Sequence, residues 1–394
     1  MESPEILTRA FRSSPAYELV LFDRLPEEQR RQLADLAKDP ELYGVLRPRE
    51  GLGLSLKSAD RDTALLFFTL QEPGPLPAYV LAQLGEAAAR TVARFVADGV
   101  LEVDRGDGSF LSGAAALPLF AAPTSFSGRQ EKEGRIATLS LNALRCVQAL
   151  PSEDVRALSL RLYSYNRQPL TPRWKSLLPD AEAVERHLGI AAGGPHRKAL
   201  DRGWRRLQRM EGWIAWSSRA VGGDAEGLPD QPTWKLYVSP RPEALEEGFG
   251  AILDALTAAR ARQFKVGENA AGLLRADKIV AYFPSFERLA EAADAVVTRL
   301  AGAPAQGVPF TSEIGGDGLL SWGVDPPRSE RAWSAGESWR AWLAHRLARA
   351  LLAARTGGGG GNEKIEPWRF ALDRLRLEGI DTDTWTPGAL LWKE

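Results

Sequence analysis

The stretch that decides the fold is residues 234–238, which read WKLYV in a chain of 394 residues. Aromatic and β-branched residues favour a strand, and successive side chains of a strand point to opposite faces of its sheet. Lys235 and Tyr237 are therefore expected on one face, with apolar residues on the other. A cation beside a phenol is a candidate anion-binding or proton-transfer site. An edge strand with a solvated face would give the same pattern.

Outward from this strand, predicted helices and short strands are mixed along the chain. We expect helices at 141–150, 152–165, 181–188, 198–211, 242–260, 286–300 and 336–355, and strands at 213–216, 279–283, 308–311 and 318–322. A mixture of this kind predicts the α+β fold class.

The first 128 residues read as a separate small domain. Two apolar stretches at 63–70 and 77–84 precede a helix at 87–98, and residues 100–103 alternate like a strand before the turn signal DRGDGS at 104–109. Three short helices followed by a hairpin is the order of a winged helix. The third helix offers only Arg90 and Arg94 as cations, which disfavours nucleic-acid binding. Peptide binding and a purely structural cap remain as alternatives.

Two further segments divide the rest of the chain. Residues 120–134 have the composition of a linker, so the α+β domain is expected over 129–356. The five glycines at 357–361 follow a helix rather than a strand, which indicates a flexible tether and not a phosphate loop. The tail over 357–394 contains Trp368, Phe370, Leu375 and Trp385 and is apolar enough to dock on the body.

Composition excludes several classes of function. Lys and Arg total 50 against 51 acidic residues, so net charge indicates no nucleic-acid or membrane partner. One cysteine and three scattered histidines offer no disulfide and no metal-ligand set. No signal core or membrane-length apolar run is found, and we expect a cytoplasmic protein.

Cations cluster just before the strand at 279–283. Lys265, Arg275 and Lys278 lie close together in sequence, and Asp277 is placed to orient one of them. Clustered Arg and Lys side chains suit the binding of a phosphate. A charged surface loop would look the same.

A third group lies further along the chain. Residues 307–311 and 315–328 are rich in Gly and Pro, which indicates a shaped loop carrying Thr311 and Asp325. Arg340 and Arg346, on the following helix, are two further candidate anion ligands. Surface salt bridges are the alternative for both.

In order and spacing, five motifs resemble the HopA-type effector family. They are WKLYV (234–238), FKVGEN (264–269), RADKIVAYF (275–283), GVPFT (307–311) and GLLSWGVDPP (318–327). That family includes stand-alone phosphoserine and phosphothreonine lyases of class V lanthipeptide and thioamitide pathways. It is more distantly similar to the phosphothreonine lyases of bacterial effectors and to the lyase domain of class III lanthipeptide synthetases. The resemblance covers about residues 163–355.

The resemblance implies a phosphothreonine-lyase-like domain that removes phosphate by β-elimination without a metal or cofactor. Lys265 matches the family's base lysine, Arg275 a phosphate-binding arginine, and Lys235 the lysine of a K-x-H pair. The sequence departs from that pair, because Tyr237 stands where the phosphothreonine lyases have histidine. With a reference pKa of about 10, tyrosine is a poorer acid at neutral pH. Either Tyr237 or Lys235 is the acid, or the activity is lost or changed.

The resemblance also implies a substrate and partners. The expected substrate is a phosphorylated ribosomal precursor peptide, whose Ser or Thr residues become dehydroalanine or dehydrobutyrine. A separate kinase-like protein would supply the phosphate, because the chain contains no kinase motif. The winged-helix-like domain would hold the leader segment of the precursor. The alternative is a degenerate lyase-like module that binds a modified peptide or a partner enzyme.

Overall fold

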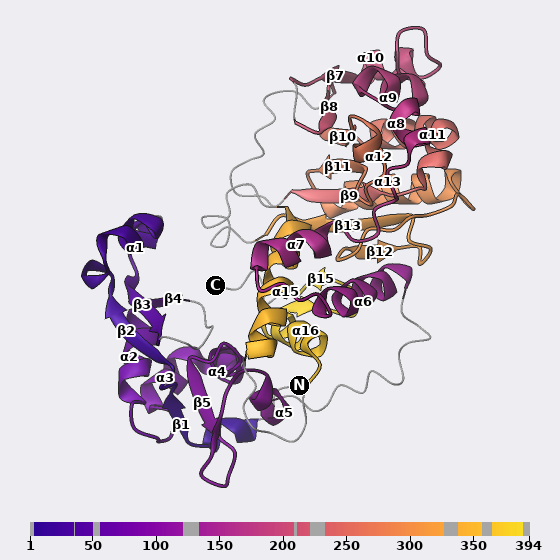
Figure 1. Ribbon diagram of the computed structural model, residues 1–394. Helices are drawn as coiled ribbons and strands as arrows, with labels where there is room; N and C mark the ends of the chain where they lie inside the picture. The colour runs from indigo at the N-terminus through magenta and orange to yellow at the C-terminus, as the bar shows by residue number, and fades with distance from the viewer. Residues whose placement is uncertain are drawn as a thin grey trace. The chain divides into compact units, whose positions relative to one another are not determined.

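The computed structural model describes residues 4–34, 36–49, 56–120, 134–208, 211–220, 233–326, 338–356 and 365–388 (Figure 1). These residues form two compact units. The first unit comprises Met1–Gly128 and Arg346–Ile380, and the second comprises Arg129–His345 and Asp381–Trp392, within the described ranges. Helices and strands are mixed, which confirms the α+β class. The glycine tether, and the expected linker between Phe120 and Gly134, lie outside the described residues.

The first unit contains two small antiparallel sheets and several short helices. One sheet has the order β2–β3–β4 and the other β1–β5–β6. The strands are β1 (Phe11–Ser13), β2 (Tyr17–Leu21), β3 (Leu42–Pro48), β4 (Lys57–Asp60), β5 (Leu101–Asp104) and β6 (Phe110–Leu111). The helices are α1 (Glu27–Gln32), α2 (Arg61–Thr69), α3 (Ala78–Leu84), α4 (Ala88–Ala97), α5 (Leu117–Phe120) and α16 (Pro367–Leu377), with 3-10 turns at Pro4–Thr8, Phe22–Arg24, Leu36–Lys38, Gly85–Ala87 and Gly113–Ala116.

Helices α2, α3 and α4 are followed by the β5–β6 hairpin, in the predicted order. Val92 and Val96 of α4 are fully buried in the core of this unit. The helix ends at Ala97, and the chain turns away at Gly99, whose φ of +70° lies in the left-handed region that glycine enters without strain. Assignment of this unit to the winged-helix fold remains a prediction.

The second unit is built on a seven-stranded sheet with the order β12–β13–β9–β11–β10–β8–β7, in which every neighbouring pair is antiparallel. Its strands are β7 (Trp204–Arg206), β8 (Trp213–Ser218), β9 (Trp234–Val238), β10 (Gln263–Gly267), β11 (Ile279–Phe283), β12 (Ser312–Ile314) and β13 (Leu320–Val324). The helices within it are α6 (Arg135–Gln148), α7 (Val155–Tyr163), α8 (Pro172–Leu177), α9 (Ala181–His187), α10 (Arg197–Gly203), α11 (Leu245–Ala258), α12 (Ala270–Leu273) and α13 (Phe286–Arg299), with a 3-10 turn at Pro242–Ala244. Helix α15 (Trp339–Thr356) and the short strands β14 (Ile380–Asp381) and β15 (Thr386–Pro387) complete the chain.

One face of the seven-stranded sheet is apolar. Leu236, Val238 and Phe264 lie in the core that α11 and α13 cover, and these two helices pack against each other (Figure 1). The alternation predicted for WKLYV is confirmed, because Lys235 and Tyr237 point to the opposite face. Strand β9 has β13 on one side and β11 on the other, so it is not an edge strand.

Two predicted elements differ from the structure in their bounds, and one strand was missed. The helix expected at 198–211 ends at Gly203, because Trp204 packs edge-on against Phe264, 4.7 Å between ring centroids, and begins strand β7. The short strand expected near 308–311 begins at Ser312, as β12, because the preceding residues form a turn in which Thr311 Oγ1 donates to the carbonyl of Val308. Strand β10 was not predicted at all.

Membrane-spanning helices are not found in the part of the chain that the structure describes.

Strand β10 depends on a close backbone approach that only glycine allows. A Cβ built on Gly267 would lie 2.3 Å from the carbonyl carbon of Gly272 in α12. We expect Gly267→Ala to lower the free energy of unfolding by about 1–3 kcal/mol, because two backbone segments must move apart. Urea unfolding measures this. Gly203→Ala is the matched control, since its Cβ would meet Thr257 at an ordinary 3.4 Å. Equal midpoints for the two variants would contradict the close approach.

Candidate functional site

The candidate site lies on the polar face of the seven-stranded sheet. Lys235 of β9 pairs with Tyr282 of β11. Val280 of β11 lies between Tyr237 of β9 on one side and Lys265 of β10 on the other. Residues directly opposite one another project from the same face of a sheet. Three adjacent strands, β9, β11 and β10, therefore bring both lysines to one face although 30 residues of sequence separate them.

Two aromatic rings line the space between the lysines. Lys265 Nζ lies 4.3 Å from the ring centroid of Trp213 and 5.7 Å from that of Tyr282. Lys235 Nζ lies 5.8 Å from the Tyr282 ring and forms an ion pair with Asp325. Both ammonium groups thus contact the ring of Tyr282.

The environment of Lys265 favours the neutral amine. The pKa of Lys265 is lowered from 10.5 to about 8, chiefly by burial and then by the charge of Lys235, with a smaller effect of Arg275, whereas Asp277 opposes them. The side chain is only partly buried, so a substrate has access to it. A lysine with this pKa is unprotonated in a useful fraction of molecules near neutral pH, as a general base must be.

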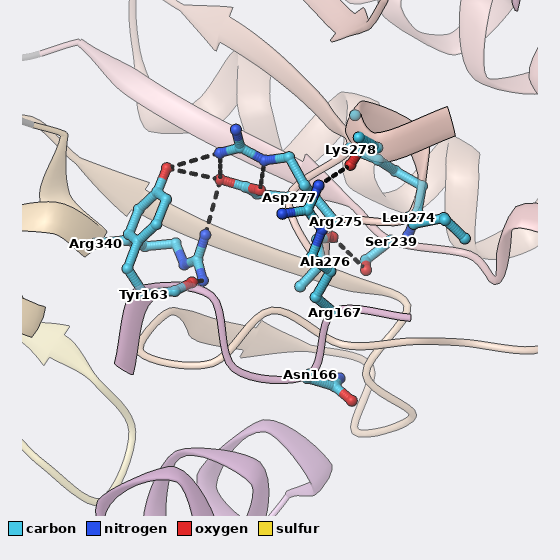
Figure 2. Close-up of polar contacts among 12 residues, drawn as sticks. Tyr163, Asn166, Arg167, Ser239, Leu274, Arg275, Ala276, Asp277, Lys278 and Arg340 are labelled. Atoms are coloured by element: carbon cyan, nitrogen blue, oxygen red, sulfur yellow. Dashed lines mark hydrogen bonds and ion pairs between the residues drawn. The ribbon is translucent and has the colours of Figure 1, made fainter. Parts of the chain in front are cut away.

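A buried carboxylate, Asp277, holds Arg275 and Arg340 in place (Figure 2). Asp277 accepts hydrogen bonds from Arg275 Nε at 2.8 Å and Nη2 at 3.0 Å, and from the Tyr163 hydroxyl at 3.0 Å. Arg340 Nη1 lies 2.8 Å from the same carboxylate. Burial alone would raise the pKa of Asp277, but Arg340 and Arg275 hold it well below its usual range. Asp277 is therefore a fixed negative charge.

Arg275 remains accessible within this network. Its side chain is 28% exposed, and its guanidinium stacks 4.8 Å from the Trp213 ring centroid. The Tyr163 hydroxyl accepts a further hydrogen bond from Arg275 Nη2 at 3.0 Å (Figure 2). Arg275 is thus held in place on one side and open on the other, which suits binding of an anion.

The other two predicted phosphate ligands of this unit are buried. Arg340 is 1% exposed and donates to the backbone carbonyls of Pro309 and Tyr163. Lys278 is fully buried and donates to the carbonyl of Pro240 at 2.8 Å and to Gln306 Oε1 at 2.6 Å. Burial lowers the pKa of Lys278 to about 7. Arg340 and Lys278 are therefore bound to the backbone carbonyls of loops, and neither side chain is exposed to a phosphate in this structure.

The remaining predicted site residues lie in different places. Asp325 is at the site, paired with Lys235. Thr311 is fully buried in its turn. Tyr237 is 3% exposed, and burial raises the pKa of its phenol well above the ordinary value. Arg346 lies in the first unit, where its Nη1 is 2.9 Å from Glu378.

Three residues of the site were not found from the sequence. Tyr282 sits on the same face as Lys235, which strand alternation within IVAYF would have indicated once the pairing of β9 and β11 was known. Trp213 opens β8, and nothing in the sequence relates it to Lys265. Tyr163 ends α7, more than a hundred residues from Asp277.

Solved structures give distant likenesses. An effector protein from Pseudomonas syringae pv. syringae strain 61 is 13% identical, with a TM-score of 0.36 over 64% of this chain and 98% of that one. The phosphothreonine lyase OspF from Shigella flexneri is 9% identical, with a TM-score of 0.28 over 39% of this chain and 88% of that one. The phosphothreonine lyase SpvC from Salmonella is 11% identical, with a TM-score of 0.25 over 53% of this chain and 97% of that one. The chain is similar to these proteins. At such scores no residue role is transferred from them.

The other two comparisons found nothing. Neither a protein-family model nor a curated protein matches this chain. The chemistry of the site therefore rests on its own geometry. Within the described residues, no three His, Cys, Asp or Glu side chains gather as a metal site would require.

The charge of Lys235 is one cause of the low pKa of Lys265, and this is testable. We expect Lys235→Met to raise the pKa of Lys265 from about 8, because one neighbouring positive charge is removed. The titration of the side chain can be followed by NMR of lysine ammonium groups. The control is Lys198→Met, an exposed lysine of α10, which should leave the pKa unchanged. A pKa of Lys265 that stays the same or falls in Lys235→Met would refute this electrostatic coupling.

Proposed function

We propose that this protein is a phosphoserine/phosphothreonine lyase, which eliminates phosphate from a phosphorylated residue and leaves a dehydroamino acid. The observation that carries the proposal is the pairing of a lysine poised to be neutral with an accessible, rigidly held arginine. Lys265 and Arg275 share the Trp213 ring, at 4.3 and 4.8 Å from its centroid. A base and an anion-binding cation side by side are what β-elimination of a phosphate requires.

The proposed reaction balances as follows. The neutral amine of Lys265 takes the proton from Cα of the phosphorylated residue and becomes an ammonium. The electron pair of the broken Cα–H bond forms a Cα=Cβ double bond, and the bond between Cβ and the phosphate oxygen breaks. The departing phosphate takes that bond's electrons and a proton from an acid. Phosphoserine yields dehydroalanine and phosphothreonine yields dehydrobutyrine, with no oxidant, reductant or cofactor.

Each cation of the site has a separate role in the proposal. Arg275 binds the phosphate oxygens and stabilises the charge that develops on them. Asp277 acts through Arg275, which it holds by two hydrogen bonds, and Arg340 acts through its ion pair with Asp277. Removal of the Cα proton leaves Lys265 positively charged, which adds a further cation close to the leaving phosphate.

We assign the acid to Lys235 rather than to Tyr237. A group that donates a proton must reach the leaving oxygen. Tyr237 is 3% exposed, and its raised pKa makes it a weak donor. The ammonium of Lys235 lies on the same face as Lys265, against the Tyr282 ring that both contact. The ion pair with Asp325 orients it there.

For the substrate, we propose a phosphorylated ribosomal precursor peptide, modified beforehand by a separate kinase-like protein in the cytoplasm. The motifs that resemble class V lanthipeptide and thioamitide lyases support this choice. The buried tyrosine at position 237 favours one second candidate: a degenerate module that binds the modified peptide without chemistry. The two differ in whether Lys265 removes a proton.

The direct test is the mass of a phosphoserine peptide after incubation with the protein. We expect loss of the elements of phosphoric acid, abolished by Lys265→Ala and by Lys265→Arg, because arginine keeps the charge but is never neutral. Tyr237→Phe should retain activity if Lys235 is the acid. Lys198→Ala is the control for an exposed lysine. Binding of the peptide at unchanged mass would favour the degenerate module.

The pH dependence follows from the pKa of Lys265. Only the neutral amine is a base, so kcat/KM should rise about tenfold per pH unit below about 8 and level off above it. A pH series with the phosphoserine peptide measures this. A rate that falls as the pH rises from neutrality would exclude Lys265 as the base.

A further inference from the structure

A cluster of cations lies in the first unit and takes no part in the proposed chemistry. The cations come from four elements: Lys57 of β4, Arg94 of α4, Arg346 and Arg349 of α15, and Arg374 of α16. They surround two carboxylates, Asp98 just after α4 and Glu378 just after α16. Helices α4 and α16 pack together. We call these residues the basic cluster.

Two arginines, Arg374 and Arg346, form ion pairs with the two carboxylates. Arg374 Nη2 lies 2.8 Å from Asp98, and its Nη1 lies 2.8 Å from Glu378. Arg346 Nη1 lies 2.9 Å from Glu378. The charges of Asp98 and Glu378 are therefore already balanced.

Three cations of the basic cluster form no ion pair of their own with a described carboxylate. Among the residues that the structure describes, no carboxylate lies within ion-pair distance of Lys57, Arg94 or Arg349. Five cations face two carboxylates, an excess of three positive charges. Burial is the main cause of the lowered pKa of Lys57; the charge of Asp98 opposes it, and those of Arg349 and Arg374 add to it.

The unbalanced charges are accessible. Arg94 and Arg349 are exposed, and Lys57 is partly exposed beside the ring of Tyr17, 5.9 Å from its centroid. An uncompensated group of like charges raises the local concentration of anions. It also lowers the stability of the unit through self-repulsion, which an anionic ligand would relieve.

The arrangement suits separate carboxylates better than a continuous phosphate chain. Asp98 lies among the cations with 34% of its side chain exposed, and would repel a polyanion laid across the cluster. Side-chain carboxylates spaced along a peptide can each meet one cation and avoid Asp98. Arg94 and Arg349 offer the forked donors that pair with carboxylates at two points.

We propose that the basic cluster binds an acidic stretch of the peptide substrate, in a segment that is not itself modified. This inference rests on the proposed function, since it takes the substrate to be a peptide. Lys57, Arg94 and Arg349 each meet one glutamate or aspartate side chain. The first unit thereby holds the peptide while the second unit modifies it.

The test uses the full chain and a short fluorescein-labelled peptide rich in glutamate, with binding followed by anisotropy at low and high salt. We expect the double variant Arg94→Gln/Arg349→Gln to bind about tenfold more weakly, with a smaller dependence on salt. The matched control is Arg24→Gln/Arg30→Gln, which removes two exposed arginines of the same unit outside the cluster. It should bind like the unaltered chain.

A second readout separates this inference from the proposed function. Elimination from a short phosphoserine peptide without acidic residues should proceed equally in both double variants. If elimination occurs but the cluster variant binds the glutamate peptide as tightly as the control does, the inference is wrong and the lyase stands. Tighter, cluster-dependent binding of a labelled oligonucleotide would also overturn it. Absence of elimination in every variant would instead count against the proposed function.

Discussion

The candidate site depends on one buried carboxylate. Asp277 is 5% exposed, and an isolated charge at such a position would be costly. Arg275, Arg340 and the Tyr163 hydroxyl satisfy it, and together they join the segment before β11 to α15 and α7 at one point. Removing either arginine would leave buried charge less compensated, which is costly, so this arrangement is favoured. That arrangement fixes the guanidinium of Arg275 against Trp213, beside Lys265.

The pKa of Lys265 is the product of the same architecture. Strand pairing places Lys235 and Lys265 on one face, and the packing of Trp213 and Tyr282 withdraws the amine from water. Burial and the neighbouring cations act in one direction, and Asp277 acts in the other. Because Asp277 is already paired with two arginines, its opposing effect does not prevail. The structure thus separates the charges by role: arginines remain cationic, and one lysine is poised to be neutral.

Sequence reasoning found what lies along one strand and missed what lies between strands. The alternation of WKLYV predicted the shared face of Lys235 and Tyr237. The sequence also predicted that Asp277 orients one of three nearby cations, and the structure shows that this cation is Arg275. The burial of Arg340 and Lys278 was not accessible, because it depends on loops from distant parts of the chain. Arg346 follows Arg340 by six residues, yet it lies in the other unit with Glu378. Trp213 carries no local signal, since only the pairing of β8 with β10 brings it to Lys265.

The central claim is that Lys265 removes the Cα proton, and an isotope experiment tests it most directly. A phosphoserine peptide deuterated at Cα would be incubated with the protein, and the product identified by mass spectrometry. The account predicts a dehydroalanine product that has lost both the phosphate and the deuterium, formed more slowly than from the unlabelled peptide. A serine product that retains the deuterium would show hydrolysis of the phosphate instead, and would contradict the account.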